Sequence, residues 1–339
     1  MPNFGSILEL MTRPTDRLIQ DVKKIDGDIM VLGAGGKIGP ALSIMAKRAI
    51  DAAGLKKRVV AVTLFDYSDA PSQMRDAGVE IIEADLMDHE RLKALPDIPN
   101  IIFMAGKKFG TYQNQSLTWA TNVLLPAKVC ERFPEAKIVA FSTGNVYRYQ
   151  DVTMGGAHED DELVPVGEYA QTCVGRERVM SYYTEKNKTK MLMFRLFYAI
   201  DMRYGVLFDI AKAIHDGRQV DISGTYFSCI WQGDCCEYAI RSLLHCNNPP
   251  ELLNVTGPEG ISVRWAAETL GKMMGKTPVF TGTQSGKAVV FANTSKLNRL
   301  MGYPAMPLLE MMKMTADWIS SGGSYINAPT HFEQTDGNY

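Results

Sequence analysis

The chain has 339 residues, of which 46% are hydrophobic and 22% are charged, and its formal net charge is -2 at pH 7. This composition is typical of a globular protein with a large core, and the length favours two linked lobes. The nearly balanced charge argues against a polybasic surface, so we expect neither nucleic acid nor membrane as a partner.

The cysteines and histidines are arranged in no pattern that predicts a metal site. The six cysteines show no paired Cys-x-x-Cys spacing, and the five histidines are scattered without the spacing of metal ligands. No apolar run reaches transmembrane length, and none near the N-terminus has the shape of a signal peptide. We therefore expect no metal and a cytoplasmic protein with reduced thiols.

A separate segment precedes the first predicted strand. Within residues 1–25, residues 14–22 have the pattern of a capped amphipathic helix. This pattern predicts an N-terminal helical extension that is added outside the core fold.

Residues 28–39 combine a short apolar run, three regularly spaced glycines and the start of a helical pattern. Gly33, Gly36 and Gly39 stand three residues apart. Such glycines allow a tight turn, a close approach of the backbone to a pyrophosphate, and close packing of the following helix. The amino end of that helix offers unpaired N–H groups to the anion. We therefore predict a dinucleotide site, although a glycine-rich loop also serves as a plain turn.

An acidic residue follows the second predicted strand. Residues 58–64 form a β-branched run, and Asp66 comes directly after it. A dinucleotide fold needs an acid at this place for the adenosine ribose hydroxyls, and a carboxylate repels the 2′-phosphate of NADP. Asp66 therefore favours NAD. The alternative is an aspartate that only caps the following turn.

Strands and helices alternate along the first half of the chain. Further strands are predicted over residues 79–86, 100–104 and 137–141, with helical patterns between them. This alternation predicts an α/β fold with a Rossmann-type, doubly wound parallel sheet. Ligands bind beyond the carboxyl ends of such strands. We expect six residues to converge there: Gly33, Asp66, Asp85, Ala105, Lys108 and Thr143.

A series of short segments in a fixed order carries a family resemblance. They are the glycine triplet, Asp66, Ala84-Asp85-Leu86, Met104-Ala105-Gly106, Thr121-Asn122-Val123, Phe141-Ser142-Thr143-Gly144, Phe194-Arg195-Leu196-Phe197-Tyr198, Gly233-Asp234 and Leu253-Asn254-Val255. Each segment alone is a weak signal. In this order they resemble the extended short-chain dehydrogenase/reductases, the NAD-dependent sugar epimerase/dehydratase family.

The resemblance implies a domain arrangement and a dimer. An NAD-binding Rossmann domain would span residues 26–200 and return through about 225–255. A smaller C-terminal α/β substrate lobe would comprise residues 201–224 and 256–339. In this family two long helices, here residues 113–132 and 167–187, pair with their copies in a homodimer.

The resemblance also implies which residues hold the cofactor NAD. Those residues are Gly33, Gly36, Lys37, Ile38, Gly39, Asp66, Asp85, Leu86, Ala105, Gly106, Lys108, Asn122, Tyr169 and Cys173.

The family's catalytic residues are a Ser or Thr, a Tyr, and a Lys four residues after that Tyr. Thr143 and Tyr169 match the first two, and Cys173 stands in the place of the lysine. A lysine at that place touches the nicotinamide ribose and lowers the pKa of the tyrosine, typically by about one to three units, and a thiol does neither well. The positive nicotinamide ring, and Lys107 or Lys108, can supply part of that charge. Arg176 is a weaker substitute, because it lies about two helical turns from Tyr169.

A second departure concerns the substrate. Family members that act on nucleotide sugars usually carry an arginine shortly before the aspartate matched by Asp234, and Phe227 stands at that place. Phenylalanine cannot bind a diphosphate as arginine does. A free sugar, a sugar acid or another polyol-like carbonyl compound therefore becomes as good a candidate as a nucleotide sugar, unless Arg203, Arg218 or Arg264 supplies the charge.

The sequence thus predicts an NAD-dependent epimerase, dehydratase or dehydrogenase that acts on a small sugar-like substrate. Tyr169 would be the acid and base, and Thr143 would hydrogen-bond the reacting oxygen. The alternative is an NAD-binding regulatory or scaffolding protein with weakened catalysis, which Cys173 favours and the retention of Thr143 and Tyr169 opposes.

Overall fold

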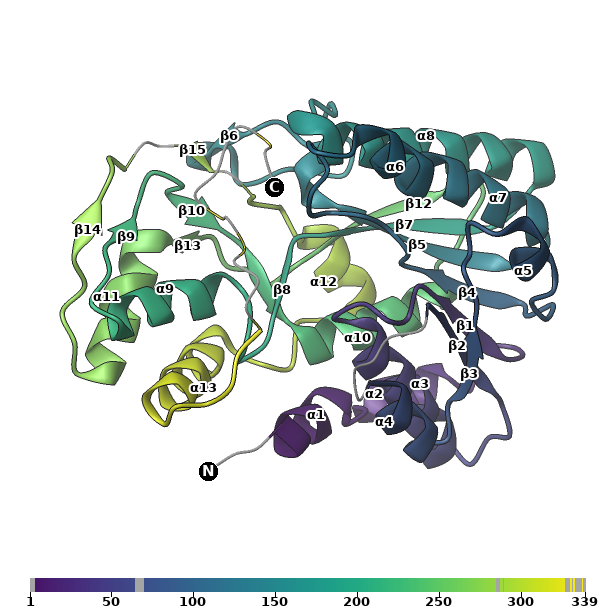
Figure 1. Ribbon diagram of the computed structural model, residues 1–339, viewed down its shortest axis with the longest axis horizontal. Helices are drawn as coiled ribbons and strands as arrows, with labels where there is room; N and C mark the ends of the chain where they lie inside the picture. The colour runs from purple at the N-terminus through teal and green to yellow at the C-terminus, as the bar shows by residue number, and fades with distance from the viewer. Residues whose placement is uncertain are drawn as a thin grey trace.

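The computed structural model describes residues 4–64, 70–284, 287, 288, 290–326, 330, 332 and 337. A seven-stranded parallel sheet with helices on both faces forms the larger lobe, and a smaller α/β lobe lies beside it (Figure 1). The strand order is β12-β7-β5-β4-β1-β2-β3. The predicted fold class is therefore confirmed. The strands are β1 (Ile29–Leu32), β2 (Val59–Thr63), β3 (Glu80–Glu83), β4 (Asn100–Phe103), β5 (Lys137–Thr143), β7 (Met191–Leu196) and β12 (Glu251–Val255).

The central strands are buried on both faces, which explains their continuous apolar runs. In β1, Ile29 and Val31 face one core while Met30 and Leu32 face the other. The first core is covered by α3 (Gly39–Ala52), α10 (Gln232–Arg241) and α12 (Ser295–Met301), and the second by α5 (His89–Lys93), α7 (Leu125–Arg132) and α8 (Gly167–Asn187). Figure 1 shows α7 and α8 on one side of the sheet and α3 and α10 on the other. α4 (Ala70–Asp76) precedes β3.

The helix predicted over residues 113–132 contains a widened turn. α6 (Gln115–Trp119) runs into a π-helical turn (Ala120–Leu124) and then into α7. The N–H of Leu125 donates to the carbonyl of Ala120, which is the i to i−5 spacing of a π-helix. Such turns are frequent at functional sites, and this one carries the buried Asn122.

The smaller lobe has its own core. It is built from α9 (Val206–His215), α11 (Val263–Met274) and α13 (Leu308–Ser320), with the short strand pairs β10 (Tyr226–Phe227) with β13 (Ile261–Ser262) and β9 (Val220–Asp221) with β14 (Phe280–Thr281). Phe227 is 2% exposed and belongs to this core. Two further pairs are β8 (Tyr198–Ile200) with β11 (Cys229–Trp231), and β6 (Gln150–Asp151) with β15 (Lys287–Ala288). Within residues 256–339, α12 packs on the larger lobe.

The N-terminal extension packs into the cores of both lobes. The expectation from the sequence, that it is added outside the core fold, is therefore wrong. The extension consists of α1 (Phe4–Thr12) and α2 (Asp16–Asp21), and the Thr15 side chain caps α2 by accepting the Leu18 N–H. Ile7 and Met11 belong to the core of the smaller lobe, whereas Leu18 belongs to that of the larger lobe. The sequence pattern over residues 14–22 predicted α2 but not α1, and it carried no information about the surface that either helix covers.

Polar contacts hold the same extension in place. Arg48 of α3 pairs with Glu9 at 2.7 Å, and Arg241 of α10 pairs with Asp21 at 2.7 Å. The extension is therefore fixed to the helices beneath the sheet by ion pairs as well as by apolar packing.

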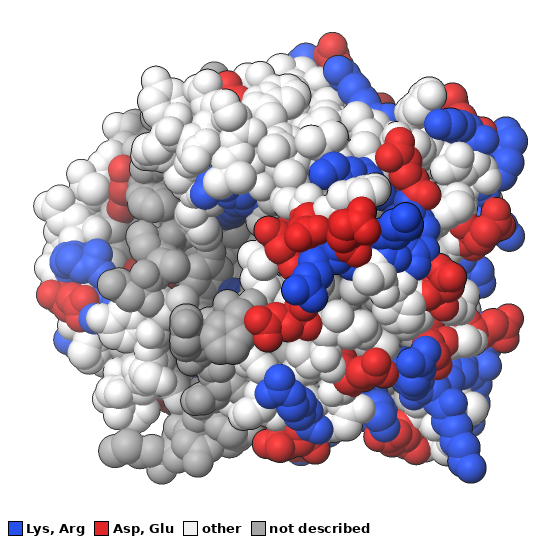
Figure 2. Space-filling model, turned by 45° about the vertical axis from the view of Figure 1, so that its right-hand side comes forward, with Lys and Arg blue, Asp and Glu red and all other residues white. Residues whose placement is uncertain are grey.

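Charged side chains of both signs are exposed on the larger lobe. On the face shown in Figure 2, Lys and Arg side chains are interspersed with Asp and Glu, and no patch of a single sign forms. Among the described residues, no helix is long and apolar enough to cross a membrane, and no group of three or more His, Cys, Asp or Glu side chains could hold a metal ion.

The packing of the extension predicts a measurable loss of stability. Met11→Ala should lower the free energy of unfolding by about 2 to 5 kcal/mol, because the side chain is 1% exposed and its removal leaves a cavity. Leu309→Ala is the matched control at a side chain that is 56% exposed, and it should change the value by less than about 0.5 kcal/mol. Denaturant unfolding monitored by circular dichroism measures both. Equal stability of the two variants would contradict the packing.

Candidate active site

A cleft with two connected cavities lies at the carboxyl ends of the parallel strands. The larger cavity has a volume of about 600 Å³ and the smaller one about 270 Å³. They share four lining residues, Gly33, Gly36, Met104 and Gly106, which come from the loops after β1 and β4. The cleft is therefore an elongated space that bends around the glycine loop, as a bound dinucleotide requires.

The glycine loop is shaped for close backbone packing. Gly33 has φ 87°, and a Cβ there would lie 2.6 Å from the Cα of Ala105. A Cβ on Gly39 would overlap the carbonyl of Ala34, so α3 packs against the loop only because this residue is glycine. Gly36 differs, because a Cβ there would meet no protein atom closer than 4.0 Å. A side chain at this position would therefore extend into the open space of the cleft and would not clash with other protein atoms.

The larger cavity lies at the ends of β2 and β3. Residues that follow β2 and β3 line it, including Thr63, Leu64, Asp85 and Leu86. The Asp85 carboxylate accepts the N–H of Met87 at 2.8 Å, which fixes the turn after β3. Asp66, the predicted ribose-binding acid, lies outside the described residues.

The smaller cavity brings the predicted catalytic pair together. Thr143 ends β5 and Tyr169 lies in the first turn of α8, and both line this cavity. The Thr143 hydroxyl donates a hydrogen bond to the Tyr169 oxygen, and this bond lowers the tyrosine pKa. Burial has the larger effect and raises the pKa of Tyr169 well above its ordinary value. The resting tyrosine is therefore a phenol that is ready to donate a proton.

Cys173 is fully buried one turn along α8 from Tyr169. A hydrogen bond between the Tyr169 and Cys173 side chains raises the tyrosine pKa, and burial raises the pKa of the thiol, so Cys173 stays neutral. A neutral acceptor at this place holds the proton on the phenol. A lysine there would have the opposite effect.

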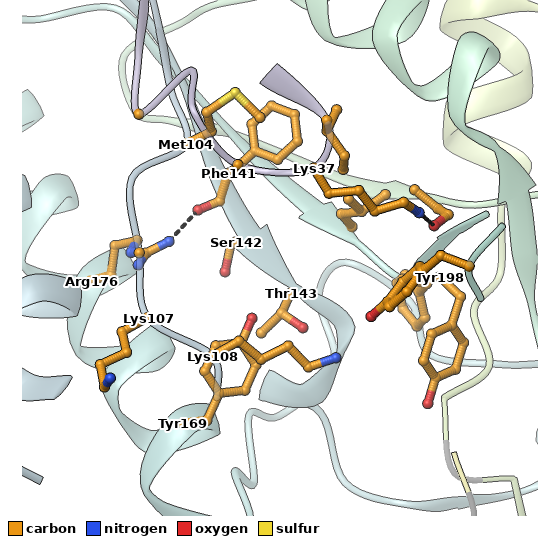
Figure 3. A pocket seen from close by; sticks show the side chains of 18 residues that line it. Lys37, Met104, Lys107, Lys108, Phe141, Ser142, Thr143, Tyr169, Arg176 and Tyr198 are labelled. Carbon is orange, nitrogen blue, oxygen red and sulfur yellow. Dashed lines mark hydrogen bonds between the residues drawn. The ribbon is translucent and has the colours of Figure 1, made fainter. Parts of the chain in front are cut away.

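Two lysines reach the smaller cavity from different walls (Figure 3). The Lys108 side chain extends across the cavity in front of Tyr169. Lys37 donates to the Ala199 carbonyl at 2.9 Å, and its ammonium lies 4.1 Å from the centre of the Tyr204 ring. Burial lowers the pKa of each lysine to about 8. Both ammonium groups are therefore mostly charged at pH 7 and lose that charge as the pH rises through 8.

Arg176 also lines the smaller cavity, although its distance along the helix suggested a lesser role. Seven residues are about two turns of α8, so Arg176 lies on the same helix face as Tyr169. Its guanidinium donates to the Phe141 carbonyl at 2.7 Å, as Figure 3 shows, and to the Asn122 carbonyl at 3.2 Å. The parallel sheet brings the end of β5 beneath α8, and this tertiary contact cannot be derived from helical spacing.

A buried hydrogen-bond network fixes α8 against the sheet. Glu177 of α8 and Arg195 of β7 form an ion pair at 2.8 Å. Ser142 of β5 donates to Glu177 at 2.5 Å, and Arg195 donates to the Tyr147 hydroxyl at 2.5 Å. Tyr147 in turn donates to Asn254 of β12 at 2.8 Å. The network therefore connects α8 to three neighbouring strands and sets the position of Tyr169.

Most of the predicted site residues meet in the cleft. Those that line it are Gly33, Gly36, Lys37, Ile38, Asp85, Leu86, Ala105, Gly106, Lys108, Thr143 and Tyr169. Three others lie behind its surface: Gly39, Asn122 and Cys173. The sequence analysis missed Phe141, Phe197, Tyr198 and Tyr204 as lining residues. The first three belong to recognisable family segments, whereas Tyr204 has no sequence signal.

A model of the NAD dependent epimerase/dehydratase family matches residues 29–255. The chain belongs to that family. The matched segment contains the glycine loop, Thr143 and Tyr169, so the candidate site of this epimerase/dehydratase-family protein lies within the family's shared region. No curated protein matches the sequence significantly.

Solved epimerase structures share the fold of this family member. UDP-glucuronic acid 4-epimerase from Bacillus cereus, in complex with UDP-glucuronic acid and NAD, aligns with a TM-score of 0.70 and 18% identity over 87% of this chain and 99% of its own. UDP-glucose 4-epimerase from Thermus thermophilus, in complex with NAD, aligns with a TM-score of 0.67 and 21% identity over 86% and 98%. A putative epimerase from Burkholderia cenocepacia gives 0.68 and 17% over 87% and 99%.

The open space at Gly36 predicts the effect on NAD binding of adding one methyl group there. Gly36→Ala should weaken NAD binding at least about tenfold, because the methyl group enters the cleft, while the stability of the free protein changes by less than about 0.5 kcal/mol. Gly54→Ala is the matched control with the opposite pattern. Its φ of 70° makes alanine cost about 1 to 2 kcal/mol of stability, and it lies outside the cleft. Calorimetric titration and thermal unfolding measure both. Unchanged NAD affinity in Gly36→Ala would contradict the predicted loop.

Proposed function

We propose that the protein binds NAD in the cleft and catalyses a reversible hydride transfer on a sugar or sugar derivative. The residues present fit the cofactor, because the glycine loop leaves space where a pyrophosphate needs to approach the backbone. Lys108 and Lys37 offer positive charge beside that loop. Asp66 remains the proposed reason for a preference for NAD over NADP. When bound, NAD supplies the chemistry of accepting a hydride from a carbinol carbon and returning it.

The observation that carries this proposal is the contact between Thr143 and Tyr169 in the smaller cavity. During reduction the Tyr169 phenol would give its proton to the substrate oxygen, and during oxidation its ionised form, which the positive nicotinamide ring of bound NAD+ favours, would take the proton from the substrate hydroxyl. Thr143 would hold the reacting oxygen beside the phenol. Phe197 and Tyr198 add aromatic surface to the wall of the same cavity.

The substrate class remains a proposal drawn from the smaller lobe. Phe227 is a core residue in β10, so no ligand-binding cation projects from its position. Arg218 pairs with Asp216 at 3.5 Å, and Arg264 lies 4.3 Å from the centre of the Phe280 ring. These contacts favour a sugar acid or a free sugar over a nucleotide sugar. The nucleotide-sugar class is the runner-up, because the B. cereus relative was solved with UDP-glucuronic acid.

The second candidate function is an NAD-binding regulatory protein without turnover. Cys173 favours it, because a neutral thiol that accepts the Tyr169 proton holds the phenol in its protonated form. Such a protein would bind NAD as tightly as the enzyme would. Only a measurement of substrate turnover separates the two functions.

The proposed mechanism predicts the effect of removing one oxygen atom. Tyr169→Phe should lower turnover by about 10² to 10⁴-fold, because the reacting hydroxyl loses its proton partner. NAD affinity should stay within about threefold of the wild-type value. The measurement is NADH absorbance and isomer exchange on a panel of free sugars, sugar acids and UDP-sugars. A fully active Tyr169→Phe would refute the mechanism, and tight NAD binding without turnover on the panel would favour the regulatory protein.

We also propose a homodimer through α6, the π-helical turn and α8. Large apolar side chains are exposed there, including Trp119 at 43% and Tyr182 at 57%. Tyr182→Arg should convert the dimer to a monomer in sedimentation velocity, because a desolvated charge would enter the interface. Tyr303→Arg is the matched control, since Tyr303 is 68% exposed and lies near α12. A wild-type monomer, or a dimeric Tyr182→Arg, would contradict this interface.

A further inference from the structure

Arg176 is a buried cation whose hydrogen-bond acceptors are all neutral. The residue is 5% exposed, and its guanidinium donates to the Phe141 carbonyl, the Asn122 carbonyl and the Asn122 side-chain oxygen. Among the described residues, no carboxylate lies within ion-pair distance of it. Burying a charge without a counter-ion costs free energy, so its retention beside a cavity indicates a role for the charge itself.

The cavity wall is built to admit this guanidinium. A Cβ on Gly106 would lie 2.6 Å from the Arg176 Nη2 atom, so any larger residue would displace the cation. Gly106 lines both cavities. Arg176 therefore lies directly behind the loop at which the two halves of the cleft join.

Arg176 lies on the same face of α8 as Tyr169 and Cys173. Tyr169, Cys173 and Arg176 are four and three residues apart on α8, which places them in a row. The Arg176 charge lowers the pKa of Tyr169 and of Cys173, against the larger effect of burial. The cation therefore acts in the direction in which the missing lysine would act.

We propose that Arg176 is a positioning residue that supplies Tyr169 with the fixed positive charge which the lysine replaced by Cys173 would otherwise provide. It also holds the loop that carries Lys108. The Asn122 oxygen that accepts Arg176 accepts the Lys107 N–H at 2.8 Å, and the Asn122 amide donates to the Lys107 carbonyl at 2.9 Å. This inference rests on the proposed role of Tyr169.

A matched pair of variants separates charge from hydrogen bonding. Arg176→Gln keeps an amide donor without the charge, and Arg176→Lys keeps the charge without the planar fork. The readout is the ζ-carbon NMR signal of labelled Tyr169 in the NAD+ complex, where the positive nicotinamide ring should bring the tyrosine pKa down from its raised value in the free protein. The signal is assigned with Tyr169→Phe and titrated from about pH 6 to about pH 11. The Tyr169 pKa should rise by about one unit or more in Arg176→Gln and stay within about half a unit in Arg176→Lys.

Asn122→Asp provides a second route that leaves Arg176 in place. The new carboxylate is nearly isosteric and would pair with the guanidinium, so the Tyr169 pKa should again rise by about one unit. In the Arg176→Gln background, Cys173→Lys should lower it again. The proposal is overturned if Arg176→Gln and Asn122→Asp both keep the wild-type pKa, if Arg176→Lys shifts it as much as Arg176→Gln, or if wild-type Tyr169 does not ionise in this range. The titration needs no substrate. A protein that behaves as expected here but turns over no sugar would refute the proposed function and not this inference.

Discussion

The buried ion pair between Glu177 and Arg195 is the contact on which the candidate site depends. A pair of this kind adds little net stability, because desolvation of the two charges offsets their attraction, but it strongly favours one arrangement over its alternatives. Here it fixes the position of α8 along the sheet, since a slip of one residue would separate Glu177 from both Arg195 and Ser142. Tyr169 lies two turns nearer the start of the same helix, so this pair also sets where the phenol lies.

The sequence predicted the large sheet well because its signals are local and repeated. The run before Gly33, the β-branched residues of β2 and the alternation of strand and helix each depend on neighbours in the chain. The carboxyl-end rule then placed Gly33, Ala105 and Thr143 in one cleft without any knowledge of distances. The glycines of the loop after β1, Thr143 and Tyr169 all lie within the segment that matches the family.

The remaining features depend on contacts between distant segments. Helical spacing predicted only a minor role for Arg176, because it lies about two turns from Tyr169. In the structure, the Phe141 carbonyl of β5 accepts a hydrogen bond from its guanidinium and holds it in the cavity wall. The π-helical turn that presents Asn122 has no sequence signature of its own. Comparison with the family motif shows that Cys173 stands in the place of a lysine. The packing of α8 on the sheet shows that the Arg176 guanidinium lies in the cavity wall, on the same helix face as Tyr169.

The N-terminal extension also constrains the order in which the chain can fold. Ile7 and Met11 complete a core that includes residues of α9, α11 and α13, roughly two to three hundred residues further along the chain. During synthesis α1 therefore leaves the ribosome long before the part of its contact surface that lies on the smaller lobe exists. The larger lobe must likewise wait for β12 before its sheet is complete. Docking of α1 onto the smaller lobe therefore needs the late segments of the chain, and a chain that stops before α13 would leave Ile7 and Met11 without part of their packing surface.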